Sequence, residues 1–264
     1  MIKKDILNKI TVILPLYKTP HNLIKQFNQY KDLKLIILDQ SNDQELKKKT
    51  LEQNPNILKY ITLDKNIGFA KACNLLLKNV KTKYCLLTQA DMKISLKSIY
   101  QMLIALNKIK NCIISAPNLS RNIKKKKLTL VNNVIGANFL FDVKKMNKFK
   151  FFDENFFLYW EDVDLCYRIK KTKYKMIIVN NAVAKHFSSK SSTNNMHTFF
   201  IRNINFKFGE YLFYKKIGKL KKYKALRQII TNFIYFLINL IKLNLLNSLK
   251  NISYIIGIFK FLAK

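Results

Sequence analysis

The 264-residue chain is 49% hydrophobic and carries a formal net charge of +34, from 49 basic and 15 acidic residues. This length and apolar content exclude a disordered chain and suit one α/β domain with an appendage, or two small domains. Four of the basic residues are Arg: Arg121, Arg168, Arg202 and Arg227. Because nucleic-acid readers rely on clustered Arg forks, the charge predicts attraction to anionic surfaces and no specific recognition of nucleic acid.

The cysteines Cys73, Cys85, Cys112 and Cys166 form no CxxC pair and show no metal-finger spacing. The N-terminal segment MIKKDILNKI has neither the long apolar core nor the cleavage site of a signal peptide. We therefore expect four buried structural thiols and a reduced, cytoplasmic setting.

Short apolar runs that favour β-structure alternate with helical segments over the first hundred or so residues. The expected strands cover residues 10–16, 34–38, 57–63 and 84–88, and the expected helices lie near residues 21–30, 43–53, 69–80 and 95–109. This βα alternation predicts one Rossmann-like, mainly parallel sheet with flanking helices and right-handed crossovers. A fifth strand is expected at residues 112–116, and residues 124–127 predict a solvated loop.

Polar residues follow each of the first four expected strands. Pro15 and Tyr17 close the first, residues 39–43 follow the second, residues 64–68 follow the third, and residues 89–91 follow the fourth. Each group alone is compatible with a turn or a helix cap. Ligands of parallel sheets bind at the carboxyl ends of the strands, so four such endings together predict a ligand site.

The segment FFLYWEDVDLCYR, residues 156–168, places three carboxylates directly behind a block of large apolar side chains: Glu161, Asp162 and Asp164. Partial desolvation raises the proton affinity of a carboxylate, so one of them is a candidate general base. The structural alternative is an acidic first turn of a helix, in which Asp164 pairs with Arg168 at i,i+4.

These segments, in their order and spacing, resemble a family 2 glycosyltransferase of the GT-A fold, close to the rhamnosyltransferase-like branch. The matching pieces are ITVILPLYK, LIILDQSND, NIGFAKACN, LLTQAD, GANFLF, FDENFFLYWEDVDLCYRI and AKHFSSKSS, spread over roughly residues 10–192. The resemblance implies a glycosyltransferase domain over about residues 1–200, with a nucleotide-binding half to about residue 117 and an acceptor half over about residues 118–200.

The resemblance also implies a nucleotide-diphosphate-sugar donor, with UDP or dTDP as the nucleotide. Pro15 and Tyr17 would flank the base, and Asp39 would hydrogen-bond the base or the ribose. The other implied nucleotide-pocket residues are Asn66, Gly68 and Lys71. Glycine suits its position because a ligand can approach its backbone closely.

In the family, an Asp-x-Asp motif after the fourth strand presents Mn²⁺ or Mg²⁺ to the diphosphate. The corresponding triplet here runs from Gln89 to Asp91, so the first carboxylate is missing. The implied metal ligands are Asp91 and His186, the histidine of AKHFSS. A hard cation often binds one or two carboxylates together with phosphate oxygens and waters. The alternative for His186 is a packing or surface role, which is usual for a lone histidine.

Inverting sugar transfer needs a base for the acceptor hydroxyl, and the resemblance assigns that role to Asp162. Glu161 and Asp164 would orient the acceptor or support the loop. Trp160 would offer an apolar face to an acceptor sugar ring, with core packing as the alternative.

Residues 201–264 predict a basic, amphipathic helical tail. The stretch FYKKIGKLKKYK precedes an apolar segment in which five residues, spaced four, three, four and three apart, form a polar stripe: Gln228, Asn232, Tyr235, Asn239 and Lys242. A spanning helix needs about 20 mainly apolar residues without such a stripe. We therefore expect a helix on the anionic inner face of the plasma membrane, with packing on the catalytic domain or on a second subunit as the alternative.

Together these patterns predict a metal-dependent, inverting hexosyltransferase, with rhamnose among its candidate sugars. Its expected acceptor is a hydroxyl of a lipid-linked or other saccharide in cell-envelope polysaccharide biosynthesis. One alternative is a GT-A domain that binds nucleotide-sugar without transferring it, motivated by Gln89. A basic nucleic-acid-binding protein is the other alternative, with less support.

Overall fold

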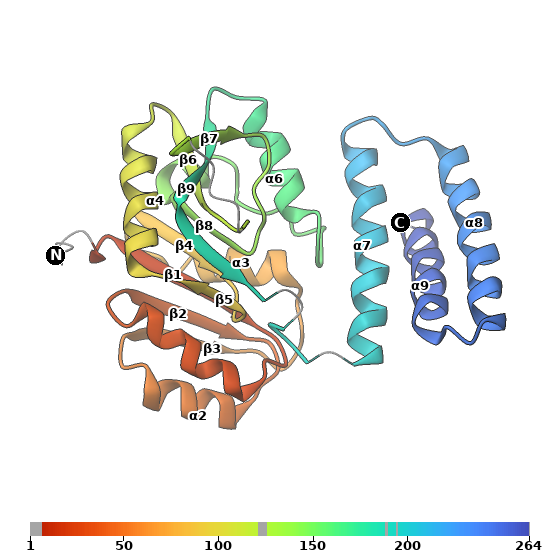
Figure 1. Ribbon diagram of the computed structural model, residues 1–264, viewed down its shortest axis with the longest axis horizontal. Helices are drawn as coiled ribbons and strands as arrows, with labels where there is room; N and C mark the ends of the chain where they lie inside the picture. Colours follow the sequence, from red (N-terminus) through yellow and green to blue (C-terminus); the bar gives the residue numbers. More distant parts are fainter. Residues whose placement is uncertain (1–6, 121–125, 188–189, 194, 264) are drawn as a thin grey trace. The chain divides into compact units, whose positions relative to one another are not determined.

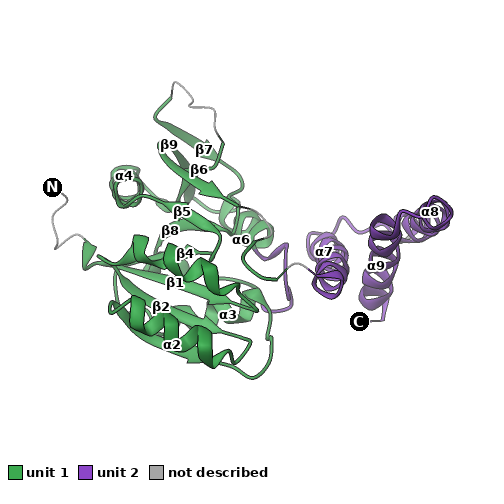
Figure 2. Cartoon of the chain, turned by 60° about the horizontal axis from the view of Figure 1, so that its bottom comes forward, with its two compact units in different colours: residues 1–153, 162–193 green, residues 154–161, 194–264 purple. Residues whose placement is uncertain are grey.

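The computed structural model describes residues 7–120, 126–187, 190–193 and 195–263. Part of the loop expected at residues 124–127 and part of the AKHFSSKSS segment lie outside the described residues. The chain divides into two compact units, residues 1–153 with 162–193 and residues 154–161 with 194–264 (Figure 2). The second unit takes in residues 154–161, which the predicted boundary at residue 200 places in the first.

The first unit is built on a mixed sheet with strand order β3-β2-β1-β4-β8-β6-β9-β5 and with β7 paired to β9 (Figure 1). The strands are β1 (Ile10–Leu16), β2 (Lys34–Asp39), β3 (Ile57–Thr62), β4 (Tyr84–Thr88), β5 (Met92–Ile94), β6 (Cys112–Asn118), β7 (Leu128–Val131), β8 (Asn138–Asp142) and β9 (Lys175–His186). The helices of this part of the chain are η1 (His21–Tyr30), α2 (Gln44–Gln53), α3 (Phe69–Leu77), α4 (Leu96–Lys108), α5 (Val143–Asn147) and α6 (Glu161–Lys170).

The predicted α/β sheet is confirmed. Strands β1 to β4 pair in parallel, whereas β8 runs antiparallel between β4 and β6. The long strand β9 and the three short strands β5, β7 and β8 were not predicted, because each depends on pairing with a distant strand. The segment at residues 21–30 is a 3-10 helix that follows Pro20, which provides no side-chain cap.

Both faces of the sheet are buried, which explains its continuous apolar strands. Alternate residues of β1 enter different clusters: Val12 and Leu14 pack with η1, α2 and α4, while Ile13 packs with α3 and α6. All four cysteines are buried and unbridged, as predicted. Burial raises the pKa of Cys112 to about 11 and the pKa of Cys166 to about 12.

The second unit contains the helices α7 (Met196–Lys216), α8 (Lys222–Ile241) and α9 (Leu245–Leu262), with α9 lying between the other two (Figures 1 and 2). This confirms the predicted C-terminal helical region. Close packing of α9 on α7 depends on Gly257, where a Cβ atom would stand 2.5 Å from the carbonyl oxygen of Ile204. Within the described residues, every helix is too short or too polar to cross a membrane.

Replacing Gly257 by Ala should therefore destabilise the helical unit. Alanine is favoured over glycine inside a helix by about 1 kcal/mol, so a net loss, of about 1–3 kcal/mol, would report the overpacking against Ile204. Urea unfolding followed by the fluorescence of Trp160, which belongs to this unit, measures the change. The exposed Asn247→Ala on the same helix is the control, and a Gly257→Ala protein as stable as wild type would contradict the close approach.

Candidate active site

The loops that follow β2 and β3 are fixed to each other by side-chain hydrogen bonds. Asp39, fully buried at the end of β2, accepts hydrogen bonds from the backbone N–H groups of Ser41 and Asp43, both at 3.0 Å. The Gln40 Oε1 atom accepts from the N–H of Ile67 at 2.9 Å, which joins the two loops. Asp39 thus shapes its own loop, and its bond to a base or ribose stays a prediction.

The turn that opens α3 is built by Asn66 and Gly68. Asn66 Oδ1 accepts the N–H of Gly68 at 2.9 Å, and Gly68 has φ of 89°, a conformation that glycine alone adopts without strain. Lys71 is exposed in the first turn of α3, while Pro15 and Tyr17 are half-buried at the end of β1. All the predicted nucleotide-binding residues therefore lie at the carboxyl edge of β1, β2 and β3.

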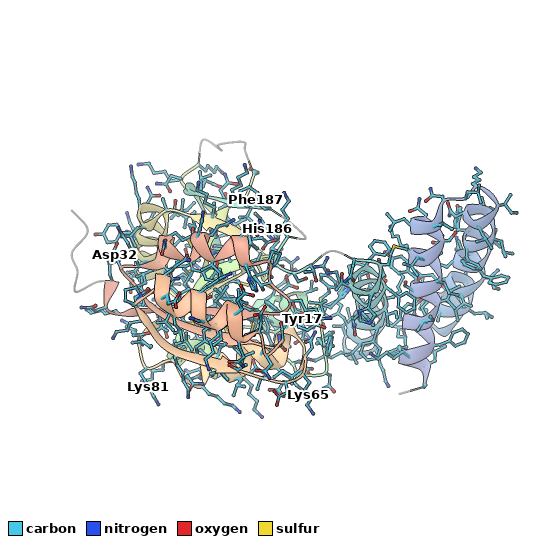
Figure 3. The ribbon with its side chains drawn as sticks, turned by 90° about the horizontal axis from the view of Figure 1, so that it is seen from below. Tyr17, Asp32, Lys65, Lys81, His186 and Phe187 are labelled. Atoms are coloured by element: carbon cyan, nitrogen blue, oxygen red, sulfur yellow. The ribbon has the colours of Figure 1, made fainter. Side chains whose placement is uncertain are left out.

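Asp91 and His186 meet beside the short pairing of β5 with β9, where Met92 lies opposite His186. Asp91 is fully buried, its Oδ1 atom lies 3.5 Å from His186 Nε2, and its Oδ2 atom accepts the N–H of Lys190 at 3.1 Å. Burial by itself would raise the pKa of Asp91, but the interaction with the nearby His186 and the hydrogen bond from the Lys190 N–H outweigh it and hold the pKa below its ordinary value. Figure 3 labels His186, together with Tyr17 from the end of β1.

The pair of Asp91 and His186 fits a divalent cation. Asp91 Oδ1 is buried and has no hydrogen-bond donor among the described residues. Octahedral Mg²⁺ or Mn²⁺ with bonds of about 2.1 Å places neighbouring donor atoms about 3.0 Å apart, so Asp91 Oδ1 and His186 Nε2, 3.5 Å apart, would move closer by about half an ångström to share a cation. The described part of the chain gathers no group of three His, Cys, Asp or Glu side chains, so a cation at this pair needs further ligands from a bound diphosphate and water.

Asp162 is held rigidly at the start of α6. Its Oδ2 atom accepts the backbone N–H of Gly136 at 2.8 Å, and its Oδ1 atom accepts the N–H of Val163 at 2.8 Å. Burial is the largest influence and raises the pKa of Asp162, although both hydrogen bonds act to lower it. A fixed carboxylate with raised proton affinity has the properties of a general base.

A polar contact between β4 and β8 places Asp162 at the same edge of the sheet as Asp91. Asn138, the first residue of β8, lies opposite Thr88, the last residue of β4, and donates from Nδ2 to Thr88 Oγ1 at 3.0 Å. Gly136 precedes this contact by two residues, and Asp91 follows Thr88 by three. Because β8 pairs antiparallel with β4, the loop before β8 lies at the carboxyl end of β4. This loop contains Gly136, whose N–H binds Asp162.

Asp164 stabilises the loop before α6. It is fully buried and accepts a hydrogen bond from Arg168 Nε at 2.7 Å. Arg168 also donates from both terminal nitrogens to the carbonyl oxygens of Phe149 and Phe151, each at 2.6 Å. The i,i+4 pair predicted as the structural alternative is confirmed, and an acceptor contact for Asp164 stays a prediction.

Trp160 packs within the helical unit. Its ring centroid lies 5.6 to 6.1 Å from those of Phe206, Phe213 and Tyr214 on α7, and a Cβ atom at Gly209 would stand 2.9 Å from its Cδ1. Much of the Trp160 ring is thus packed against α7. Its contact with an acceptor sugar stays a prediction.

The two residues before α6 have strained backbone. Tyr159 and Trp160 have positive φ values of 67° and 72°, which cost on the order of 1–3 kcal/mol each for bulky residues. Glu161 follows them and is buried, with 5% of its surface exposed. Such strain is concentrated at functional sites in other proteins, and here it lies next to the candidate base.

The profile of the family described as Glycosyl transferase family 2 matches residues 11–169. The chain belongs to glycosyltransferase family 2. The matched range contains every predicted site residue except His186. No curated protein sequence matches the chain, and the rhamnosyltransferase-like branch stays a prediction because the match reaches only the family.

Solved structures show the same GT-A-like fold at low sequence identity. A mannosyltransferase from Pyrobaculum calidifontis, in complex with GDP-Man and Mn²⁺, is 15% identical with a TM-score of 0.62, over 81% of this chain and 65% of the other. GalNAc-T7 with UDP, GalNAc and Mn²⁺ is 10% identical with a TM-score of 0.55, over 77% and 47%. Residues 1–349 of S. aureus TarS are 12% identical with a TM-score of 0.53, over 97% and 91%. This family 2 chain therefore spans about two thirds of the length of the mannosyltransferase and about half of the length of GalNAc-T7.

Sequence reasoning assigned no role to Gly136, Thr88 or Asn138. Gly136 lies in the matched GANFLF segment, but its hydrogen bond uses a backbone group, which residue type does not reveal. Its lack of a side chain was the available signal, because a Cβ atom would stand 3.2 Å from the Cβ of Asp162.

Asp162 and Asp91 should affect stability with opposite dependence on pH. The pKa of Asp91 is lowered in the folded protein, so its contribution is present above the ordinary pKa of an aspartate and is lost as the pH falls through the lowered value. The pKa of Asp162 is raised, so its contribution is present at low pH and is lost as the pH rises through the raised value.

Urea midpoints of wild type, Asp91→Asn and Asp162→Asn, measured in steps from about pH 3 to pH 7, test these signs. The stability difference between wild type and Asp91→Asn should grow with pH, and the difference between wild type and Asp162→Asn should shrink. If the two stability differences changed with pH in the same direction, the two carboxylates would have pKa values shifted in the same direction, against this prediction.

Proposed function

We propose that this family 2 glycosyltransferase moves a hexosyl residue from a UDP- or dTDP-sugar to an acceptor hydroxyl, with inversion at the anomeric carbon and with Asp162 as the base. The observation that carries the proposal is the carboxylate of Asp162, desolvated and fixed by two backbone N–H groups at 2.8 Å. Its position at the carboxyl edge of the sheet is where ligands of such folds bind.

In this mechanism the acceptor hydroxyl gives its proton to Asp162 as its oxygen attacks the anomeric carbon. The bond from that carbon to the diphosphate breaks on the opposite face of the sugar, so the configuration inverts. The raised pKa of Asp162 favours proton uptake, and the hydrogen bonds from Gly136 and Val163 hold the carboxylate in one orientation. A base that is already oriented avoids reorganisation during the reaction.

The donor is proposed to bind along the loops after β1, β2 and β3, with Pro15, Tyr17, Asp39, Asn66, Gly68 and Lys71 around the nucleotide. Support comes from the hydrogen bonds that hold these loops together and from two similar folds whose structures contain UDP or GDP-Man. Asp91 and His186 would hold Mn²⁺ or Mg²⁺ at the diphosphate. When bound, the cation neutralises the charge of the departing diphosphate.

The proposed acceptor is a lipid-linked saccharide of the cell envelope, met at the inner face of the plasma membrane. Trp160 and Glu161 are proposed to orient it, because they directly precede Asp162 in sequence, while Asp164 supports the loop through Arg168. Rhamnose is one candidate sugar, from the resemblance to the rhamnosyltransferase-like branch. A panel of nucleotide sugars, scored for release of nucleotide diphosphate with and without lipid-linked saccharides, identifies donor and acceptor together.

Replacing Asp162 by Asn should lower kcat by about 100- to 10,000-fold, because the amide cannot accept the proton. The KM for the donor should stay within a few-fold of wild type. Asp32→Asn makes the same chemical change at an exposed carboxylate of the same unit and is the control. An Asp162→Asn enzyme with the full transfer rate rules out this base.

A GT-A domain that binds nucleotide-sugar without transferring it is the rival. It is motivated by Gln89, which stands where the family has a first carboxylate. Donor binding by the wild-type protein without release of nucleotide diphosphate, across the whole panel of acceptors, would favour this rival.

Replacing Asp91 by Asn, or His186 by Ala, should weaken Mn²⁺ binding at least about tenfold, since each removes one of the two protein ligands. Electron paramagnetic resonance titration of Mn²⁺ in the presence of UDP measures binding directly. EDTA should abolish transfer by wild type, and added Mn²⁺ or Mg²⁺ should restore it. Equal Mn²⁺ affinity in wild type and both variants would show that the cation is held elsewhere.

A further inference from the structure

Helix α8 packs on the other helices through a mixed side that includes polar residues, and it leaves many large apolar side chains exposed. Gln228, Asn232 and Asn239, three members of the predicted polar stripe, are only partly exposed, and Gln228 Oε1 accepts a hydrogen bond from the hydroxyl of Tyr211 on α7 at 3.0 Å. The other two members, Tyr235 and Lys242, are exposed. The packing therefore turns much of the polar stripe away from solvent, which the sequence alone could not show.

The opposite side of α8 carries large apolar side chains at helical spacing. We define this outer face by residues that are each between 42% and 82% exposed: Leu226, Ile230, Phe233, Ile234, Leu237 and Ile241. It continues into the turn after α8, where Leu243 is 82% exposed and Leu245 is 61% exposed. Exposed apolar side chains that form a continuous stripe mark an interaction surface, whereas scattered ones do not.

The packing of α8 explains why this face is uncovered. α9 lies between α7 and α8 (Figures 1 and 2). The small cluster that joins the three helices includes one fully buried residue of α8, Ala225, with Ile229 partly buried against it. Both belong to the first half of the helix, so the second half contributes no residue to this cluster.

Basic side chains border the outer face at both ends. Lys221, Lys224 and Arg227 are exposed at its N-terminal end, and Lys242 is exposed at its C-terminal end. In the sequence from residue 195 to residue 263, Glu210 is the single acidic residue, and its carboxylate is already paired with Lys207.

We propose that the outer face of α8 lies flat in the interface of an anionic membrane, with its apolar side chains among the upper acyl chains and the bordering lysines at the lipid phosphates. A helix in this position buries its apolar face about 5–10 Å deep, and each nearby Lys or Arg contributes about 1 kcal/mol of attraction to an anionic surface. The half-buried Gln and Asn side chains stay above the acyl chains, which agrees with a helix that lies on the membrane and does not cross it.

Charge favours a membrane over a second copy of this chain. If the outer faces of two copies met, whether parallel or antiparallel, every border residue brought together would be basic: Lys221, Lys224, Arg227 or Lys242. Such like-charge contacts oppose association. An anionic lipid surface supplies both the apolar layer and the opposite charge.

This inference goes beyond sugar transfer and does not depend on it, because binding is measured without substrate. Flotation of the full chain with vesicles of phosphatidylcholine containing about 30% phosphatidylglycerol should recover bound protein, and pure phosphatidylcholine vesicles should recover far less. Binding should fall as salt is added, since lipid and protein charges are screened. A full chain that stays unbound to the anionic vesicles overturns the proposal.

Variants of the outer face give the sharper test. Phe233→Ser with Leu237→Ser should lower vesicle binding at least about tenfold. The control, Leu58→Ser with Leu130→Ser, removes two side chains that are 60% and 64% exposed on the sheet unit and should leave binding unchanged. Equal losses in the two double variants would overturn the proposal.

A pair of charge variants separates local from overall attraction and leaves the apolar face intact. Lys221→Gln with Lys224→Gln should weaken binding about tenfold. Lys48→Gln with Lys81→Gln changes the net charge by the same amount at exposed sites of the sheet unit and should change binding much less. Equal effects of the two pairs would mean that only the net charge matters and not its position on the protein. That result would contradict a membrane contact at α8.

Analytical ultracentrifugation tests whether a second copy of the chain occupies the outer face. A monomer in wild type and in Phe233→Ser with Leu237→Ser agrees with the proposal. The outer face would instead belong to a second copy if the wild-type protein does not bind the vesicles, forms a dimer, and becomes a monomer in this variant. The Trp160 fluorescence spectrum checks that each variant keeps the fold of the helical unit.

Discussion

The hydrogen bond from the backbone N–H of Gly136 to Asp162 is the constraint on which the candidate active site depends. It ties the start of α6 to the loop before β8, and a Cβ atom at position 136 would stand 3.2 Å from the Cβ of Asp162, so any other residue would displace the carboxylate by a few tenths of an ångström. The contact between Thr88 and Asn138 then brings this loop to the carboxyl end of β4. One backbone amide thereby orients the side chain that we propose as the base.

Two aspartates at this edge, the fully buried Asp91 and the half-buried Asp162, have opposite electrostatic environments. Asp91 is fully buried, and its interactions with His186 and Lys190 nevertheless hold its pKa below the ordinary value, which suits the cation ligand that we propose. Burial raises the pKa of Asp162 and suits it to take up a proton. Because the surroundings differ, two residues of the same type suit the two different roles that we propose for them, one as a metal ligand and one as a base. Asp164, a third aspartate, is used in a structural ion pair.

The helical unit is organised by close backbone approach and leaves an apolar surface exposed. Gly257 allows α9 to lie against α7, and Gly209 leaves room for Trp160. With α9 occupying the middle position, α8 meets the others through a side that holds Gln228 together with Ala225 and Ile229. Burying its apolar side as well would need another partner, and the surrounding lysines suit an anionic one.

Much of the fold and part of the site could be predicted from local patterns. The runs of Ile, Val and Leu in β1, β2 and β4 are long enough to indicate strands buried on both faces, and the spacing of Asp164 and Arg168 indicates their ion pair, because these signals lie within a few residues of chain. The short strands β5, β7 and β8 could not be predicted, because each forms only against a distant strand.

The sequence by itself determined the parallel part of the α/β sheet, formed by β1 to β4, the polar residues at its carboxyl edge and the membership of glycosyltransferase family 2, since these depend on residue types and their order. Only the tertiary structure decided that Gly136 holds Asp162, that Asp91 meets His186, and that α8 turns its apolar side outward. The physical reason is that backbone hydrogen bonds, contacts between distant segments and the direction in which a helix packs depend on positions in space, which local sequence does not specify.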